Sequence, residues 1–467
     1  MKKLAIWFVA LFVIALCAVL FFGSGNVSRI AWGQTEIVEG KNNPQVDVLK
    51  IQKAVEDNDR VILKGTFDFG GSGSVNIVKD VIVEGEEAKI VGGQRPISCT
   101  EKVKLKVKNI CFDNAKQAAI YVTRSKQLEI EECTFTNLRP VLEEAAPGSY
   151  ERINYPNNIT SSIARAIMVA TLPQSLADFN NGIYPSDHSN DISGKVVIKE
   201  NTIEALGDAN SYRVGICISG INADLEVRRN VIQNGNYVGI MLNQNAGTSI
   251  IDDNTVQTSY RGIIVGNFMG AGENDVANEA DPYYGKNLYG DPYGIPMGSF
   301  SVVNNTVTAE YSSSSFGISY YDYRIPKEGA TYEFKDNVIT VNGATNQNTG
   351  GILLFRGAKN ALWEDNIIKG IMKRAIVVNS GYGYGVLFNK YTVEDNVFRG
   401  TDLGEVTSTY NGQHVFMAGN TYNNTLKDFI GKENYVVLFY PYHYVGCETN
   451  TIDPIENWTI IACSALQ

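Results

Sequence analysis

The chain has 467 residues, and its 40 Lys and Arg against 50 Asp and Glu give a formal net charge of −10. An acidic chain without a basic block or an arginine-rich stripe does not fit nucleic-acid binding. Only three histidines and no Cys-x-x-Cys pair are present, which argues against a structural zinc site, and we predict no metal ligands.

Residues 1–33 carry the features of an export signal. Lys2 and Lys3 precede an uninterrupted apolar run from Leu4 to Phe22, so we expect an exported protein of the periplasm, the cell surface or the medium. The run is also long enough to cross a bilayer. A signal peptide cleaved after residue 33 and a retained membrane anchor therefore both stay open, and this segment is the only expected membrane contact.

Residues 34–60 form the predicted N-terminal cap. Apolar residues spaced by three and four positions from Val48 to Val55 predict a helix over 47–56, with Asp47 as its N-cap. This helix should lie across the first coil, whose core and strand edges would otherwise be exposed.

A short motif with an asparagine near its end recurs through residues 61–427. One copy is Ile250-Ile-Asp-Asp-Asn254-Thr-Val256, and most copies follow a second strand of the type Arg261-Gly-Ile-Ile-Val265. Successive asparagines are 29 and then 24 residues apart from Asn201 to Asn254. Strand patterns repeated at such a period are typical of a solenoid.

The recurrent asparagines should stack about 4.8 Å apart, with their side-chain amides bonded along the stack. This predicted structural ladder contains Asn201, Asn230, Asn254, Asn305, Asn337, Asn366 and Asn396. Cys133 takes the same position in an earlier coil, which indicates a buried thiol. Cys447 and Cys463 lie beyond the repeats and could form a disulfide in an oxidising compartment.

These residues resemble the repeats of the right-handed parallel β-helix proteins of the pectin-lyase-like superfamily, over about residues 61 to 425. The resemblance implies an all-β, single-stranded solenoid, for which we predict roughly 11 to 12 turns. Residues 428–467 lose the repeat and are rich in tyrosine, which predicts an irregular C-terminal cap. In that superfamily the fold is shared by polysaccharide lyases, hydrolases, epimerases, adhesins and accessory proteins for metal-enzyme maturation. The resemblance alone therefore selects no activity.

Four insertions fall at one phase of the repeat, and the one long connection at another phase lies near Leu138 to Ile163. From the upstream Gly or Ala to the next ladder asparagine the connection takes 15 residues in the shortest coils, but 35 from Ala166 to Asn201 and 43 from Gly262 to Asn305. Because coils stack in register, these loops must leave one flank, where recognition is usually placed. The loops are rich in tyrosine, which suits sugar rings, unless the rings only pack the loops onto the helix.

A polar column is predicted beneath this flank, five residues after each upstream Gly, at Gln244, Asn267, Asp322 and Arg356. The predicted substrate-binding residues are Gln244, Asn267, Tyr289, Tyr321, Tyr382 and Lys286. The catalytic candidates are Asp322, Arg356, Arg324 and His188. A plain surface ion pair between Asp322 and Arg356 is the alternative.

Enzymes that act on uronic-acid polymers neutralise a carboxylate and move a proton at C5, tasks that Arg356 or Arg324 and His188 could share. The segment from Asp187 to Asp191 is similar to a motif of alginate epimerases but lacks its proline. Carboxylates between residues 273 and 291 leave calcium open without a calcium-loop spacing, and no other cofactor is expected. A polysaccharide partner is predicted, with either an enzyme or a non-catalytic binding scaffold as the function.

Overall fold

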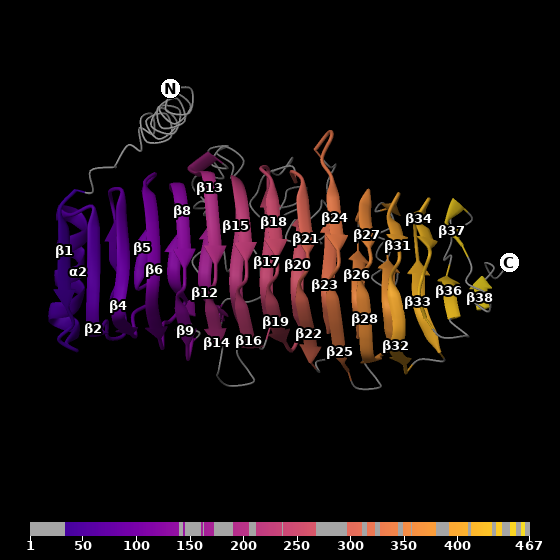
Figure 1. The fold of residues 1–467 in the computed structure, drawn as a ribbon, viewed down its shortest axis with the longest axis horizontal. Coiled ribbons are helices and arrows are strands. Elements are labelled where there is room, and N and C mark those ends of the chain that lie inside the picture. The colour runs from indigo at the N-terminus through magenta and orange to yellow at the C-terminus, as the bar shows by residue number, and fades with distance from the viewer. Residues whose placement is uncertain are drawn as a thin grey trace, which may run out of the picture.

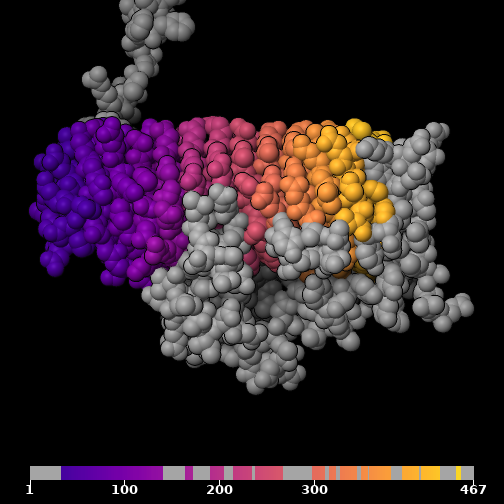
Figure 2. All heavy atoms as spheres, turned by 90° about the horizontal axis from the view of Figure 1, so that it is seen from below, coloured from indigo at the N-terminus to yellow at the C-terminus, as the bar shows by residue number. Residues whose placement is uncertain are grey.

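The computed structural model describes residues 33–139, 143–144, 160–161, 163–171, 190–204, 212–235, 237–267, 297–310, 315–322, 327–343, 349–355, 357–379, 392–409, 412–431, 436–440, 449–453 and 459–462. Pairing within these residues joins 34 strands into one sheet that winds around a single core. Figures 1 and 2 show an elongated rod along which the chain advances from one end to the other. The protein is the predicted right-handed parallel β-helix, the hand that connections between parallel strands adopt.

A complete turn of the helix contributes one strand to each of three faces. Face 1 contains β3 (Val75–Ile77), β5 (Ile97–Cys99), β7 (Ala118–Val122), β12 (Ile163–Ala170), the first half of β15 (Tyr212–Arg228), β17 (Val238–Asn245), β20 (Arg261–Asn267), β23 (Phe316–Asp322), β26 (Gly350–Phe355), β29 (Arg374–Asn379), β33 (Gln413–Ala418), β36 (Val436–Tyr440) and β38 (Thr459–Ala462).

Face 2 precedes most of the ladder asparagines. It contains β1 (Thr35–Glu39), the first parts of β2 (Arg60–Asp68), β4 (Val81–Val91) and β6 (Lys104–Asp113), then β8 (Ser125–Glu131), β13 (Ile192–Lys199), the second half of β15, β18 (Ser249–Asp252), β21 (Phe300–Val303), β24 (Tyr332–Lys335), β27 (Ala361–Glu364), β31 (Val397–Arg399), β35 (Thr425–Lys427) and β37 (Thr451–Ile452).

Face 3 follows the first asparagine ladder. It contains the last parts of β2, β4 and β6, then β9 (Thr134–Thr136), β14 (Thr202–Glu204), β16 (Val231–Gly235), β19 (Thr255–Thr258), β22 (Thr306–Glu310), β25 (Val338–Asn342), β28 (Ile367–Met372) and β32 (Asp402–Ser408). Two short pairs stand apart, the antiparallel β10 (Glu143–Glu144) with β11 (Thr160–Ser161), and the parallel β30 (Val393–Glu394) with β34 (Thr421–Tyr422).

The glycine of the face 1 motif is required by the narrow interior. A Cβ atom at Gly262 would lie 2.1 Å from Cγ1 of Val307 on face 3, and one at Gly239 would lie 2.2 Å from Cγ1 of Val256. Real Cβ atoms do not approach other carbons so closely, so face 1 and face 3 can converge at these levels only over a residue without a side chain. The isoleucine that follows, such as Ile263, fills the core and is fully buried.

The predicted N-terminal helix exists as α2 (Pro44–Asp57), beside β1 at the end of the rod (Figure 1). Its N-cap is Asn43, whose side chain accepts from the Gln45 N–H, and not Asp47 as the sequence suggested. The cap must have extended backbone, and Pro44 fixes the first helical residue just after Asn43. Asp47 is fully buried instead and accepts backbone N–H bonds from Lys41, Asn43 and Asp68, which ties the helix to β2.

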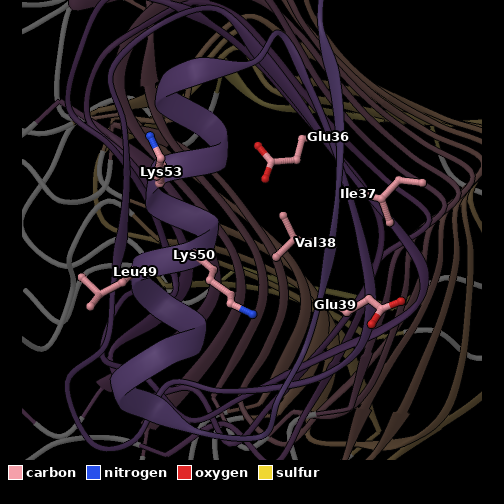
Figure 3. Close-up of a pocket in the computed structure, with 7 residues that line it drawn as sticks. All are labelled: Glu36, Ile37, Val38, Glu39, Leu49, Lys50 and Lys53. Atoms are coloured by element: carbon pink, nitrogen blue, oxygen red, sulfur yellow. The ribbon is translucent and has the colours of Figure 1, made fainter.

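A hollow of about 380 Å³ separates β1 from α2 at this end of the rod. Figure 3 shows Glu36 and Val38 pointing from β1 toward the helix and Lys50 pointing from the helix toward β1. No helix among the described residues is long and apolar enough to span a membrane, and residues 1–32 lie outside them.

The first asparagine ladder runs along the corner between faces 2 and 3. Each Nδ2 donates to Oδ1 of the next asparagine at 2.9 to 3.0 Å, and each backbone N–H donates to the same oxygen at 3.0 to 3.1 Å, through Asn201, Asn230, Asn254, Asn305, Asn337 and Asn366. The N–H of Cys133 donates to Asn201 at 3.0 Å, so the thiol occupies the ladder position one turn earlier. The amides thereby satisfy backbone groups that the corner would bury without a partner.

Asn396 belongs to a second ladder, which corrects its predicted place after Asn366. Its Oδ1 accepts from the N–H of Ala361 at 3.1 Å, and its Nδ2 donates to Asn424 at 2.9 Å. Asn424 donates in turn to Asn450 at 2.9 Å. This second ladder lies on the corner before face 2, because β31, which follows Asn396, pairs with β27, which precedes Asn366.

Both corners have the same backbone, which is why the motif does not distinguish them. Asp365 before Asn366 and Asp395 before Asn396 are left-handed, with φ 53° and 57°. Asn360, which precedes Ala361 at the equivalent corner one turn earlier, has φ 55°. Asp and Asn tolerate this conformation. Stacking also continues into the predicted C-terminal cap, where β36 and β38 extend face 1. Face 1 therefore has thirteen strands among the described residues, more than the 11 to 12 turns expected.

Candidate functional site

The outer surface of face 1 is a second hydrophobic layer. Ile263 points into the core, so Ile264 points outward, yet Ile264 is only 5% exposed. The outward row forms its own buried cluster with Ala118, Tyr121, Met168, Ala170, Val214, Cys217, Val238, Met241 and Ile264. Phe316, Leu353 and Phe355 form a neighbouring cluster on the next strands. Outward-facing apolar side chains that are buried show that much of this sheet surface is shielded from solvent.

Three arginines occupy one outward column at the start of the face 1 strands. Register pairs connect Arg165 to Arg261 through two intervening strands, and Arg261 to Arg374 through two more. Neighbouring arginines are thus three levels apart, about 14 Å at the usual strand spacing. Arg165 is 2% and Arg261 is 4% exposed, while Arg374 is half-buried.

Aromatic rings hold two of these arginines in place. The Arg261 guanidinium carbon lies 4.3 Å from the centre of the Tyr260 ring and 4.6 Å from that of Phe316, between the two. Tyr260 stacks in turn on Tyr237, with centres 4.9 Å apart and planes 3° apart. Arg374 lies 4.0 Å over the Phe416 ring. Cation–π contacts fix a guanidinium without neutralising its charge.

Polar residues at the corner before face 1 continue this surface toward the C-terminus. Main-chain bonds place Tyr237, Tyr260, Ser315, Thr349 and Lys373 at the same corner of successive levels. Ser315 and Thr349 are buried, and the Lys373 N–H donates to Thr349 Oγ1 at 2.9 Å. Rings, hydroxyls and an ammonium group therefore follow one another along the rod, beside the arginine column.

The electrostatics change near β29 and β33. Burial first, and the adjacent Arg374 second, lower the pKa of Lys373 below its usual value. Arg374 is held by Gln413, whose Oε1 accepts from Nε at 3.3 Å and from a terminal nitrogen at 3.2 Å. Burial lowers the pKa of His414 to about 4, against the opposing effect of the Gly412 backbone. Lys373 and Arg374 are thus adjacent cations whose charges act on each other.

Comparisons with known proteins give only distant likenesses. No family model matches the chain, and no curated protein does. The A-module of an Azotobacter vinelandii mannuronan C-5 epimerase has a TM-score of 0.35 at 12% identity, covering 89% of this chain and 95% of its own. A mannuronic acid specific polysaccharide family 6 lyase from human gut microbiota has a TM-score of 0.32 at 11% identity, covering 92% of each chain. At these scores they carry no argument about activity.

The predicted polar column is only partly described. Gln244 is fully buried at a left-handed position with φ 56°. Asn267 pairs in register with Asp322, which places the two residues on neighbouring strands, and their side chains lie outside the described part. Tyr321 is half-buried, with its ring 5.4 Å from that of Phe355 at 71°. Outside the described residues lie Arg356, Arg324, His188, Tyr289, Tyr382 and Lys286.

The arginine column was missed by the sequence analysis, although a signal for it exists. Arg165, Arg261 and Arg374 each stand directly before the Gly or Ala of the face 1 motif. The Gly or Ala that follows each arginine faces the core, as Ala166 and Ala375 do, so alternation with that neighbour places the arginine on the outer surface.

Among the described residues, no group of three or more His, Cys, Asp or Glu is placed to hold a metal ion. The calcium question stays open, because residues 273 to 291 lie outside that part of the chain. Cys99, Cys133 and Cys217 are buried free thiols, and Cys111 is half-buried. Burial raises the pKa of the Cys133 thiol to about 12, so it is an inert core group.

Proposed function

We propose that this protein is an exported member of the pectin-lyase-like superfamily that binds a polysaccharide along the outer surface of face 1. The observation that carries the proposal is a row of half-buried groups at the start of face 1, Tyr237, Tyr260, Lys373 and Arg374, with the buried Arg261 guanidinium packed on the Tyr260 ring. Pyranose rings have apolar faces and a hydroxyl rim, so they fit a surface of rings with fixed hydrogen-bond donors between them. The strand-borne groups are rigid, and ordering them on binding costs less entropy than ordering loops.

The direction of the ligand follows from the same geometry. Tyr237, Tyr260 and Arg261 lie mid-rod, and Lys373 and Arg374 lie toward the C-terminal end. A chain of sugars laid along the rod axis would meet the half-buried Tyr237, Tyr260, Lys373 and Arg374, whereas one laid across it would meet a single level. We therefore infer an extended polymer parallel to the axis, with several sugar units in contact.

A catalytic role is the second candidate. Asp322 is the only Asp or Glu in the face 1 strands from β7 to β29, and it lies at the end of β23. Asp322 thus belongs to the face whose strands begin at the arginine column, and a carboxyl group can move a proton on a uronic-acid polymer. Asp322, Arg356, Arg324 and His188 remain the residues proposed for this role.

A polysaccharide panel tests both candidates. The full chain is run through native gels that contain polygalacturonate, alginate or dextran, and retardation is compared with a gel without polymer. We expect at least one polymer to retard it. Incubation with the same polymers, read as unsaturated-product absorbance and as new reducing ends, then separates a lyase or hydrolase from a binder. Migration unchanged in every polymer would refute the proposal.

A further inference from the structure

We propose that the outer surface of face 3 is an interface between two copies of this chain, which pack face to face with their rods antiparallel. The inference is independent of the proposed function, which concerns face 1. Three observations support it: an uncharged stripe along face 3, complementary charges at the two ends of that stripe, and an area that reaches what a specific interface needs.

The uncharged stripe is one column of outward-facing residues on face 3. Register pairs join each member to the next over eight successive levels, through Cys111, Thr134, Thr202, Val231, Thr255, Thr306, Val338 and Ile367. The residues that follow them, such as Val256 and Val307, are buried in the core, so the column itself faces outward. Thr255, Thr306 and Ile367 are exposed, and the other five are half-buried. A row of uncharged, mostly β-branched side chains on an open sheet surface is typical of a protein contact.

Charged residues stand at both ends of the stripe. The column has Lys89 one level before the stripe and Asp402 one level after it. In the next outward column, Asp113 lies on the first level of the stripe and Lys369 on the last. Lys89 and Asp113 also contact each other within the chain at 2.9 Å. Each end of the stripe therefore carries one cation and one anion.

An antiparallel pair brings these ends together with opposite signs. A two-fold rotation about an axis parallel to the strands reverses the order of the levels and keeps each column opposite itself. Lys89 then faces the partner's Asp402, and Asp113 faces the partner's Lys369, at both ends of the contact. Complementary charges of this kind fix the register of an interface and its partner.

A parallel pair does not fit the same charges. Rotation about the rod axis keeps each level opposite itself and exchanges the two columns, so Asp402 would face the partner's Glu405. In the antiparallel pair Glu405 faces the partner's Val91 instead. Glu204, a charged residue within the second column, faces the partner's Thr308, whose hydroxyl can donate to it. The direction of the two rods therefore follows from the charges.

The two columns cover enough area for a pair. Eight levels at about 4.8 Å and strands of about 15 Å give roughly 550 Å² per copy, or about 1,100 Å² in total, which reaches the ~1,000 Å² expected of a specific interface. The strands run as nearly parallel rungs along a straight rod (Figure 1). One flat sheet can therefore lie on another at the usual spacing of about 10 Å.

A single cysteine variant tests both the pairing and its direction. Cys111 is a half-buried free thiol, seven levels or about 34 Å from Ile367 in its own chain, but the two positions face each other between antiparallel copies. Ile367→Cys in the full chain, treated with a mild oxidant, should therefore form an intermolecular disulfide with Cys111. Mass spectrometry of the linked peptides should join residue 111 to residue 367. Thr306→Cys is the matched control, because it faces the partner's Thr202 and should give no link to Cys111.

A charge within the stripe should separate the copies. Thr255→Arg lies next to the two-fold axis and would place an arginine against the partner's Val231, so the yield of the 111–367 link in the Ile367→Cys background should fall about tenfold or more. Ile250→Arg adds the same charge to the outer surface of face 2 in the same turn and should leave the yield within about twofold. Circular dichroism should show both variants folded, since both positions lie outside the core.

Sedimentation of the full chain, in a mild detergent that covers the apolar run from Leu4 to Phe22, gives a second measurement. The parent should have the mass of a dimer at micromolar concentration, and Thr255→Arg that of a monomer. A monomeric parent without the 111–367 link would overturn the interface. A link from residue 367 to residue 367 and none to residue 111 would overturn the antiparallel pair, and an equal loss of yield in Ile250→Arg would reduce the effect to overall charge and overturn the role of face 3. Polysaccharide binding on face 1 would stand in each case.

Discussion

The outer surfaces of faces 1 and 2 differ although one interior supports both. Face 2 is covered with ion pairs between successive turns, such as Lys106 with Glu129 at 2.8 Å and Arg228 with Asp252 at 3.2 Å. Face 1 has arginines on aromatic rings over an apolar layer. The inward-facing side chains of every strand must pack in the core, whereas the outward-facing side chains can vary. The outer surface of face 2 therefore presents paired charges, whereas the described part of face 1 presents aromatic rings and apolar side chains.

The largest expected effect lies in the interior that both faces share. Asn254→Asp would put a carboxylate where Nδ2 now donates to Asn305, Val227 and Asp252, leaving carbonyl oxygens against a buried charge. We expect a loss of about 3 to 5 kcal/mol in the free energy of unfolding, measured by urea denaturation. Asn360→Asp, at an exposed corner residue, should cost less than about 0.5 kcal/mol. Equal losses in the two variants would argue against the ladder as the shared support.

The second effect concerns binding and should appear on face 1 alone. Arg261→Leu removes the buried guanidinium on which the Tyr260 ring packs, so the ring is held less firmly and polymer affinity in gel retardation should fall roughly tenfold. Stability should change by less than about 1 kcal/mol or rise, since a buried cation is replaced by an apolar group. Arg228→Leu on face 2 should leave affinity unchanged. A similar loss of affinity in Arg228→Leu would erase the distinction between the faces.

The third effect gives face 1 a dependence on pH. Because the pKa of His414 is about 4 in the folded chain and about 6.5 in an unfolded one, the unfolded state binds the extra proton first as pH falls. Stability that depends on His414 is therefore lost between about pH 6.5 and 4. The melting temperature of His414→Asn should fall less across this window than that of the parent. If the melting temperatures of the two proteins fell equally between about pH 6.5 and 4, the imidazole would make no contribution to the pH dependence of stability.

The smallest effect belongs to face 2 and should depend on salt. Lys335 is 3.3 Å from Glu364 and from Glu333, with both partners partly exposed. Lys335→Met should cost less than about 1 kcal/mol at low ionic strength. At 1 M salt the screening length is about 3 Å, so the difference should vanish. A cost that persists in high salt would mean that the lysine stem, not its charge, is what stabilises face 2.

Several features of the fold could be predicted from the sequence because they repeat. Each asparagine lies next to a strand pattern of period two, so the ladder from Asn201 to Asn366 follows from local spacing alone. The start of the helix near Asp47 could be predicted too, but its cap could not, because Asn43 and Asp47 both have side chains that accept backbone N–H bonds. Only the buried position of Asp47, against the Asp68 N–H, assigns the two their different roles.

Which residues come together at the candidate site depends more on how the turns stack than on any sequence motif. The column of Gln244, Asn267, Asp322 and Arg356 was drawn by counting from the glycine, and the structure gives Gln244 a buried, left-handed position. A fixed number of residues after the glycine predicts a side chain's direction only if the strand is regular. A left-handed residue such as Gln244 interrupts the alternation, so its side chain does not point where a regular strand would place it. The catalytic and substrate-binding assignments in the loops remain predictions.

By itself the sequence determined that this chain winds into a β-helix, since every turn must bury the same apolar stripe and no turn can do so alone. Tertiary structure alone decided which turn stacks on which. The motif around Asn396 matches that around Asn366, yet Trp363 pairs with Phe398 and moves Asn396 to the other corner. The same long-range register brings Arg165, Arg261 and Arg374 into one column. Register is set by contacts between residues roughly 25 to 70 positions apart, and no local pattern contains that information.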